Sequence, residues 1–381
     1  MNMIKRSAFG AIAVVSAGLL LAACGEAPEE TPAPAESGEA SAPADAGGET
    51  SDFLPCLVSD EGGWNDRSFN QSAKEGMDRA ATELGVEAID MESTNANDYG
   101  PNLSELVSQG CDLIVSVGFN LSAATVESAL ANPDINYAIV DDLADNDFNG
   151  ETDAPNIRPL VFDTAGAAYL GGYAAAAWSH ASGVDKVGTF GGGEIPSVTI
   201  FMDGFQLGVE KFNEEKGAEV EVIGWDTEAQ SGLFTGSFEA NDTARQTAEQ
   251  VLSQGADVIL PVGGPIYTST IAAIRDSYPD AVMLGVDSDL AVKEPDNADV
   301  VLASIMKGID EATYQAAIQS ADASGEFDTT PYVGTIENGG VGLSGFHDFE
   351  SELPEGLTDE LAALQEQLVS GEIVVESPAA P

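Results

Sequence analysis

Short apolar, β-branched segments alternate with amphipathic segments along most of the 381-residue chain. Runs such as FLPCLVS, CDLIVSVG and YAIVDD are typical of strands that are buried on both faces. Between the first two runs, residues 68–84 place Ala73, Met77 and Ala80 at helical spacing, which predicts a helix. Alternation of strands and helices predicts parallel sheets built from right-handed βαβ units.

The alternating pattern runs twice. GCDLIVSVG in the first run matches GADVILPVGG in the second, and each is followed by a helical segment and then by YAIVDD or MLGVDSD. We therefore expect two similar α/β lobes whose strand ends face a shared crevice. The expected first lobe is 52–163 with about 290–328, the second is 164–289 with about 329–360, and 361–381 form a C-terminal helix and tail.

The first 23 residues predict a signal peptide. Lys5 and Arg6 precede an apolar stretch over 8–21, which is too short for a confident membrane span. The stretch ends in Leu-Ala-Ala-Cys24, which resembles the lipobox of bacterial lipoproteins. The resemblance implies cleavage before Cys24, a lipid on its thiol, and a position on the extracytoplasmic face of the cell membrane.

Residues 24–51 differ sharply in composition from the rest. They are dominated by Pro, Ala, Glu, Gly and Ser and contain no aromatic residue. Such a segment buries too little apolar surface to offset its ordering entropy, so we expect a disordered acidic linker. The folded part should begin near residue 52.

The charge of the chain excludes one class of partner. Asp and Glu number 65 against 13 Lys and Arg, which gives a formal net charge of −52. A surface of this sign repels phosphate backbones, so we expect no nucleic-acid partner.

The residues with catalytic or metal-binding chemistry are few. Cys56 and Cys111 lie in apolar runs, where buried free thiols are favoured over a disulfide, although an oxidising compartment leaves the disulfide open. His180 and His347 are far apart in sequence. There is no metal-ligand spacing, no complete GxGxxG fingerprint, no P-loop and no nucleophile elbow, so we expect no enzyme, no metal and no cofactor.

Polar and aromatic residues recur at the predicted strand ends, where ligands bind in open α/β sheets. Carboxylates there can accept hydrogen bonds from vicinal hydroxyls, and aromatic rings from different lobes can hold a flat ring between them. Taken singly, each residue is better explained by helix capping or solvation, but together they suit a nucleoside. The candidate ligand-binding residues are Asp60, Phe69, Asn70, Asp141, Phe238, Gly263, Asp287 and Lys307.

Several motifs, in this order, carry a family resemblance. They include DRSFNQ at 66–71, YAIVD at 137–141, FMDGF at 201–205, GVD at 285–287 and SIMK at 304–307. The chain resembles the basic membrane protein (BMP) family, the PnrA-like substrate-binding lipoproteins of ABC importers. The resemblance implies a two-lobed periplasmic-binding-protein-like fold of type I, a purine nucleoside ligand, and permease and ATPase partners.

The resemblance also implies roles for the candidate residues. Phe69 and Phe238 would stack on the base, Asp287 and Lys307 would hold the ribose hydroxyls, and Asp60 or Asp141 would contact a base edge or a hydroxyl. Trp64-Asn65 departs from the family, which usually has a smaller residue followed by Asp, so Trp64 is expected to cap or narrow the pocket. Two alternatives remain open: a sugar or autoinducer-like ligand, and a sensory receptor lobe.

Overall fold

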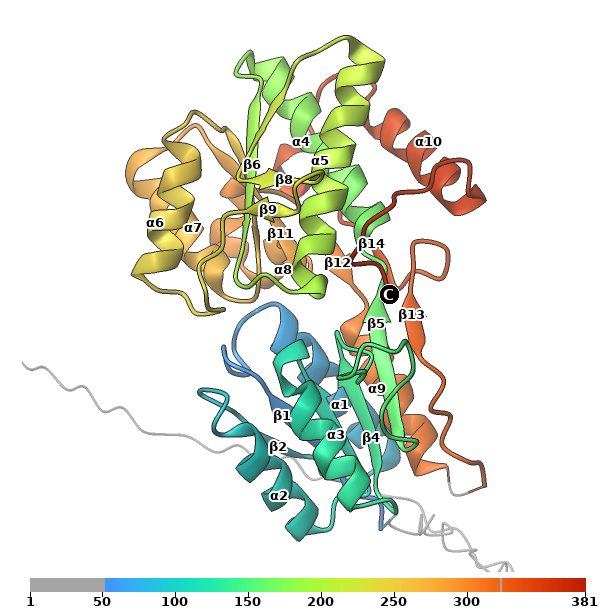
Figure 1. Cartoon of the computed structure of the whole chain (residues 1–381). Coiled ribbons are helices and arrows are strands. Elements are labelled where there is room, and N and C mark those ends of the chain that lie inside the picture. The colour runs from blue at the N-terminus through green and yellow to red at the C-terminus, as the bar shows by residue number, and fades with distance from the viewer. Residues whose placement is uncertain (1–51, 323) are drawn as a thin grey trace, which may run out of the picture. The chain divides into compact units, whose positions relative to one another are not determined.

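The computed structural model describes residues 52–322 and 324–381 as two α/β lobes (Figure 1). The predicted signal peptide, Cys24 and the acidic linker lie outside the described residues. No helix in the part that is described is long and apolar enough to cross a membrane.

The first lobe is built on a parallel sheet with helices on both faces. Its strand order is β13-β5-β4-β3-β1-β2. Helices α1 and α9 pack on one face, and α2 and α3 cover the other. The strands are β1 (Pro55–Ser59), β2 (Ile89–Met91), β3 (Leu113–Val117), β4 (Asn136–Val140), β5 (Ile157–Phe162) and β13 (Tyr332–Gly334), and the helices are α1 (Phe69–Leu84), α2 (Tyr99–Gln109), η1 (Phe119–Leu121), α3 (Ser122–Ala131) and α9 (Ile309–Ala321).

The second lobe repeats this design. Its strand order is β14-β12-β11-β10-β6-β7, and only the pairing of β12 with β14 is antiparallel. Helices α4 and α5 pack on one face and α6, α7 and α8 on the other, while α10 contacts α4. The strands are β6 (Lys186–Gly191), β7 (Glu221–Ile223), β10 (Val258–Val262), β11 (Val282–Asp287), β12 (Val301–Lys307) and β14 (Val341–Leu343), with a hairpin of β8 (Trp225–Asp226) and β9 (Ser231–Gly232). The helices are α4 (Ala165–Ser182), α5 (Pro196–Lys216), α6 (Asp242–Leu252), α7 (Ile266–Ser277), α8 (Leu290–Lys293), η2 (Pro295–Val300), η3 (His347–Phe349) and α10 (Leu357–Ser370). The predicted α/β class with two mainly parallel sheets is confirmed.

The internal repeat seen in the sequence corresponds to equivalent strands. GCDLIVSVG contains β3 and GADVILPVGG contains β10, and both strands occupy the same place in their sheets. The residues at the ends of the equivalent strands β4 and β11 are also alike, because Asp141 and Asp287 have φ of 68° and 67°. Both residues therefore have a left-handed backbone conformation at the end of their strand, which few non-glycine residues adopt.

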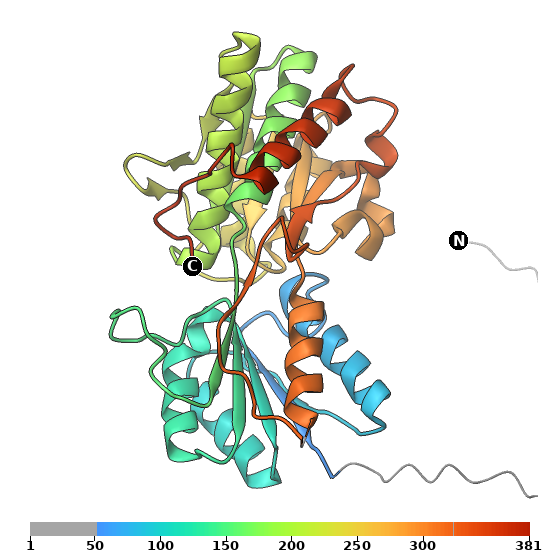
Figure 2. The ribbon, with the colours of Figure 1, turned by 90° about the vertical axis from the view of Figure 1, so that its right-hand side faces the viewer.

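The chain passes between the two lobes at positions that differ in part from expectation. The first crossing lies between β5 and α4, near residue 163. The second is expected near 289, but β12 pairs with β11 in the second sheet, so the crossing follows Lys307. The third is expected between 329 and 334, and it follows Gly334, because β13 pairs with β5 in the first sheet. Figure 2 shows these connecting segments between the lobes, where the Asp163 amide donates to the Gly334 carbonyl at 2.8 Å.

The preference for buried free thiols at Cys56 and Cys111 is wrong. The two residues form a disulfide with a Cα–Cα distance of 6.0 Å. Cys56 lies in β1, but Cys111 lies in the turn after α2, before the neighbouring strand β3 begins. Because Cys111 stands outside the strand, the general scarcity of bridges between parallel neighbours does not apply to it.

Candidate ligand-binding cleft

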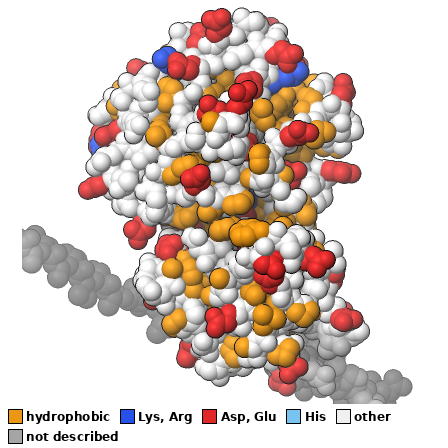
Figure 3. All heavy atoms as spheres, viewed as in Figure 1, with side chains coloured by type: hydrophobic (Ala, Val, Ile, Leu, Met, Phe, Trp, Pro, Cys, Tyr) orange, Lys and Arg blue, Asp and Glu red, His pale blue; other side chains and the backbone are white. Residues whose placement is uncertain are grey.

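A cavity lies between the two lobes at the carboxyl ends of their strands. It contains about 480 Å³ of empty space, part of which is open to the solvent. On the face shown in Figure 3, hydrophobic side chains gather where the lobes meet. The cavity is lined by all eight candidate residues, Asp60, Phe69, Asn70, Asp141, Phe238, Gly263, Asp287 and Lys307, and also by Glu61, Asp66, Gly118, Phe119, Ile195, Ser197, Val198, Phe201, Val262, Gly264 and Val286.

The start of α1 is fixed by the buried carboxylate of Asp66. It accepts hydrogen bonds from the backbone amides of Ser68 at 3.1 Å, Asn70 at 2.8 Å and Gln71 at 3.0 Å. These amides have no partner within the helix, so Asp66 does the work of an N-cap. Burial raises the pKa of Asp66 to about 6. The capped first turn holds Phe69 and Asn70 at the cavity wall.

Asn70 and Asp60 form a buried polar pair on the first lobe. The Asn70 Nδ2 atom donates to Asp60 Oδ1 at 3.1 Å and lies 3.4 Å from the Glu61 carbonyl. The Asn70 Oδ1 atom is buried and has no hydrogen-bond partner. Burial first, and then the neighbouring acids, raise the pKa of Asp60 well above its usual value. The pair can therefore offer a ligand one free acceptor and, when Asp60 is protonated, a hydroxyl donor.

Lys307 joins the two lobes inside the cavity. Its Nζ atom lies 2.6 Å from Asp141 Oδ2 of the first lobe and 3.7 Å from Asp287 Oδ1 of the second. Burial raises the pKa of both carboxyl groups, and the Lys307 charge opposes that rise. The ammonium also lies 5.0 Å from the Phe201 ring centroid and 5.5 Å from that of Phe69, which allows cation–π attraction.

Phe238 reaches the cavity because two glycines make room for its ring. A Cβ atom at Gly192 would lie 2.5 Å from Phe238 Cδ1, and a Cβ atom at Gly263 would lie 2.7 Å from the same atom. Side chains at either position would displace the ring. Gly263 is a predicted ligand contact, and the structure adds this second role.

The two candidate stacking residues come from opposite lobes. Phe69 begins α1, while Phe238 precedes α6, and both are partly buried and line the cavity. Both rings pack against the hydrophobic core and also line the cavity. The arrangement leaves both rings available to a ligand between the lobes.

The expectation that Trp64 caps or narrows the pocket is wrong. Trp64 is buried with 6% exposure, belongs to the hydrophobic core and is absent from the cavity lining. Its backbone amide donates to Glu92 Oε1 at 2.8 Å. The preceding Gly62 and Gly63 have φ of 113° and 70°, and this turn places the indole against the body of the lobe.

Sequence reasoning missed two aromatic lining residues. Phe119 follows the end of β3, so its position at a strand end was the available signal. Phe201 lies in α5, one turn into a helix whose N-terminal end faces the cavity, and helical periodicity alone does not mark it as a site residue.

The acidic residues that line the cavity are not among those described as close enough to share a metal ion. Among residues 52–322 and 324–381, the carboxylates close enough to share an ion are Asp145, Asp147 and Asp153. They lie between β4 and β5, outside the cavity lining.

Two α/β lobes around a cavity at their strand ends form a periplasmic-binding-protein-like fold. A family model described as ABC transporter substrate-binding protein PnrA-like matches residues 55–378. The chain belongs to this family, whose members are extracytoplasmic solute-binding proteins of ABC transport and not enzymes.

Known relatives cover most of the chain. The ABC transporter nucleoside-binding protein BmpA of Lactococcus lactis is 28% identical over 343 residues, 86% of this chain and 90% of that protein. An uncharacterized lipoprotein of Pyrococcus abyssi is 28% identical over 84% of this chain and 83% of its own length. The crystal structure of a solute-binding protein from Aeropyrum pernix matches with a TM-score of 0.70 and 26% identity, covering 86% of this chain and 94% of that one.

Proposed function

We propose that the cleft binds a purine nucleoside and that the protein delivers it to the permease of an ABC importer. The observation that carries the proposal is the pair of partly buried rings from opposite lobes beside the bridge of Lys307 with Asp141 and Asp287. A flat base and a polyhydroxyl sugar are the two chemical parts that such a site suits.

The base would stack between Phe69 and Phe238. Stacking of a base on an aromatic side chain contributes about 1–3 kcal/mol per base. The free Oδ1 acceptor of Asn70 and the carboxyl of Asp60 lie on the same lobe as Phe69 and would hydrogen-bond the edge of the base. The buried amide gains its missing partner when the ligand binds.

The sugar would occupy the side of the cleft where Lys307 lies. Asp287 can accept hydrogen bonds from vicinal hydroxyls, and the Lys307 ammonium can donate to them. Asp141 would hold Lys307 in place or contact a hydroxyl directly. Five carboxyl groups line the cavity, namely Asp60, Glu61, Asp66, Asp141 and Asp287, against the single charge of Lys307. This excess disfavours a phosphorylated ligand, so nucleosides should bind and nucleotides should not.

Delivery would follow from closure of the lobes and from the membrane anchor. Ligand would bind one lobe, the other would close, and the closed form would be recognised by the permease. A lipid on Cys24 and the acidic linker of 24–51 would keep the protein beside the permease. The lactococcal relative, named as a nucleoside-binding protein of an ABC transporter, supports this proposal.

A thermal-shift screen tests the proposal. A bound ligand raises the melting temperature by mass action. We expect inosine or guanosine to raise it and inosine monophosphate, ribose and myo-inositol at equal concentration to leave it unchanged. A response to a sugar or polyol but to no nucleoside would contradict the nucleoside assignment.

A further inference from the structure

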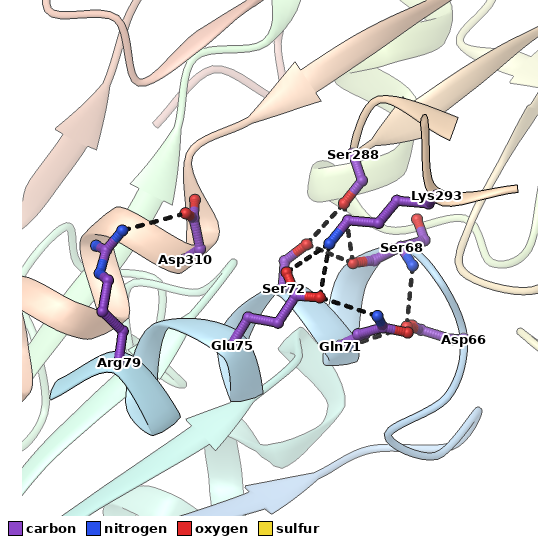
Figure 4. Close-up of polar contacts among 9 residues, drawn as sticks. All are labelled: Asp66, Ser68, Gln71, Ser72, Glu75, Arg79, Ser288, Lys293 and Asp310. Carbon is purple, nitrogen blue, oxygen red and sulfur yellow. Dashed lines mark hydrogen bonds and ion pairs between the residues drawn. The ribbon is translucent and has the colours of Figure 1, made fainter. Parts of the chain in front are cut away.

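One stripe of α1 crosses the gap between the lobes. Ser72 and Glu75 are three residues apart on one side of α1, and Ser68 precedes the helix directly as its N-cap. Their partners, Asp287, Ser288 and Lys293, belong to the other lobe, at the end of β11 and in α8. Figure 4 shows most of these contacts side by side.

The contacts at the helix start are short and buried. Ser68 Oγ lies 2.8 Å from Asp287 Oδ2 and 3.1 Å from the Val286 carbonyl. Ser72 Oγ and Ser288 Oγ are 2.7 Å apart. Ser68 does not line the cavity, yet it contacts a carboxylate that does. These contacts require the two lobes to be together.

Two ion pairs flank these contacts, one farther along α1 and one just before it, and each lobe supplies one of the two cations. Lys293 Nζ of the second lobe lies 2.5 Å from Glu75 Oε2 of the first. Arg67 Nε of the first lobe lies 3.5 Å from Glu294 Oε1 of the second. In a chain of net charge −52, two acidic lobes repel each other when they approach. Placing scarce cations at this junction offsets that repulsion.

We propose that Ser68, Ser72 and Glu75 with Asp287, Ser288 and Lys293 form an interlobe latch that positions Asp287 and slows opening of the closed cleft. Phe69 and Asn70 lie on the same helical turn as Ser68, so one helix carries both the ligand contacts and the latch. The latch acts by holding Asp287 in place and by shifting the equilibrium between open and closed lobes toward the closed form. Of the two experiments that test it, the one that measures inosine binding rests on the proposed nucleoside function.

The first experiment measures inosine binding and compares Lys293→Met with Lys74→Met. Lys74 is a matched control because it is 28% exposed against 27% for Lys293 and forms a 2.7 Å ion pair with Asp90 inside the first lobe. By stopped flow with inosine at low salt, Lys293→Met should raise the dissociation rate about 1.5- to 5-fold and leave the association rate unchanged, the effect expected of one partly exposed ion pair. In 1 M salt the difference should shrink, because the charges are screened. The exchange Glu75→Lys/Lys293→Glu should restore the slow rate.

The second experiment measures crosslinking between the lobes and needs no ligand. The Ser72→Cys/Ser288→Cys protein should crosslink across the lobes under a mild oxidant at a rate that follows the population of the closed form. Adding Lys293→Met should slow this crosslinking and adding Lys74→Met should not. Slowed crosslinking without inosine binding would support the latch and contradict the nucleoside proposal. If inosine binds but Lys293→Met and Lys74→Met have the same dissociation rate and the same crosslinking rate, the latch is overturned and the proposed function still stands.

Discussion

Buried ionisable side chains dominate the cleft at the scale of single residues. Burial raises the pKa of Asp60, Asp141 and Asp287, and Lys307 supplies the positive charge that opposes this for the last two. Removing Lys307 would leave two buried carboxyl groups without a counter-charge, which is costly unless they take up protons. The structure therefore makes Lys307 important for folding as well as for the proposed sugar contact.

The raised pKa of Asp66 predicts a pH dependence of stability. Its pKa is about 6 in the fold against 3.8 for the free side chain, so the folded state holds the proton more tightly. Stability from this group is present at low pH and falls as pH rises from about 4 to about 6, by about 3 kcal/mol at most. Urea unfolding of wild type and Asp66→Asn across this range should show the wild type losing stability relative to the variant.

Asp98 provides the control for this pH dependence. It is exposed and accepts hydrogen bonds from Thr94 Oγ1 and the Thr94 amide, which lower its pKa. Its contribution is therefore present above the usual carboxyl pKa and is lost as pH falls. Asp98→Asn should change the pH profile with the opposite slope, and identical profiles for both variants would contradict the assignment for Asp66.

The candidate residues could be selected from sequence because they stand where strands end. This rule uses only the order of apolar runs. The residues it selects, Asp60, Asp141, Asp287 and Lys307, all line one cavity. The expectation for Trp64 came instead from a departure from the family pattern, and it failed because the direction of the indole depends on the positive φ angles of two preceding glycines. No pattern of residue types encodes those angles reliably.

Helix packing is the main feature at the scale of secondary-structure elements. Helices α4 and α5 approach so closely that a Cβ atom at Gly208 would lie 2.0 Å from the Tyr169 carbonyl oxygen. Gly208→Ala must push the helix backbones apart, so we expect a loss of unfolding free energy of about 1–3 kcal/mol or more. At Gly345, which has no positive φ, a Cβ would meet no surrounding atom within 4 Å, so Gly345→Ala should be neutral or stabilising. Equal unfolding midpoints for the two variants in urea would contradict this packing.

The disulfide gives a second prediction at this scale. Cys56 and Cys111 are 55 residues apart, and closing a loop of that length restricts the unfolded chain. The loop-entropy relation predicts a loss of about 4 kcal/mol for Cys56→Ala/Cys111→Ala. Neither cysteine lines the cleft, so inosine affinity should not change. An unaltered urea midpoint would show that the bridge does not contribute.

Most elements were predictable because periodicity is a local property. The helix predicted at 68–84 matches α1 (Phe69–Leu84). The segment YVGTIENGGVGLS supplies β13 and β14 to different sheets. Strand partners are set by contacts that are distant in sequence, so the lobe boundaries after 289 could not be read locally.

The acidic charge and the three connections between the lobes act at the scale of the whole molecule. The connections run through β5–α4, β12–α9 and β13–β14, so each lobe is made of segments that are distant in sequence. Cations that pair across the lobes, Arg67, Lys293 and Lys307, lie where two acidic bodies meet. Closure should therefore depend on ionic strength more than it would in a protein of balanced charge.

The central claim is that rings from both lobes hold a nucleoside base. Calorimetric titration with inosine tests it most directly, comparing wild type with Phe238→Ala and with Phe148→Ala, whose ring is 88% exposed and outside the cavity lining. We predict that Phe238→Ala weakens binding by about 1–3 kcal/mol while Phe148→Ala leaves it unchanged. The same dissociation constant for all three proteins, or no heat with wild type, would contradict the claim.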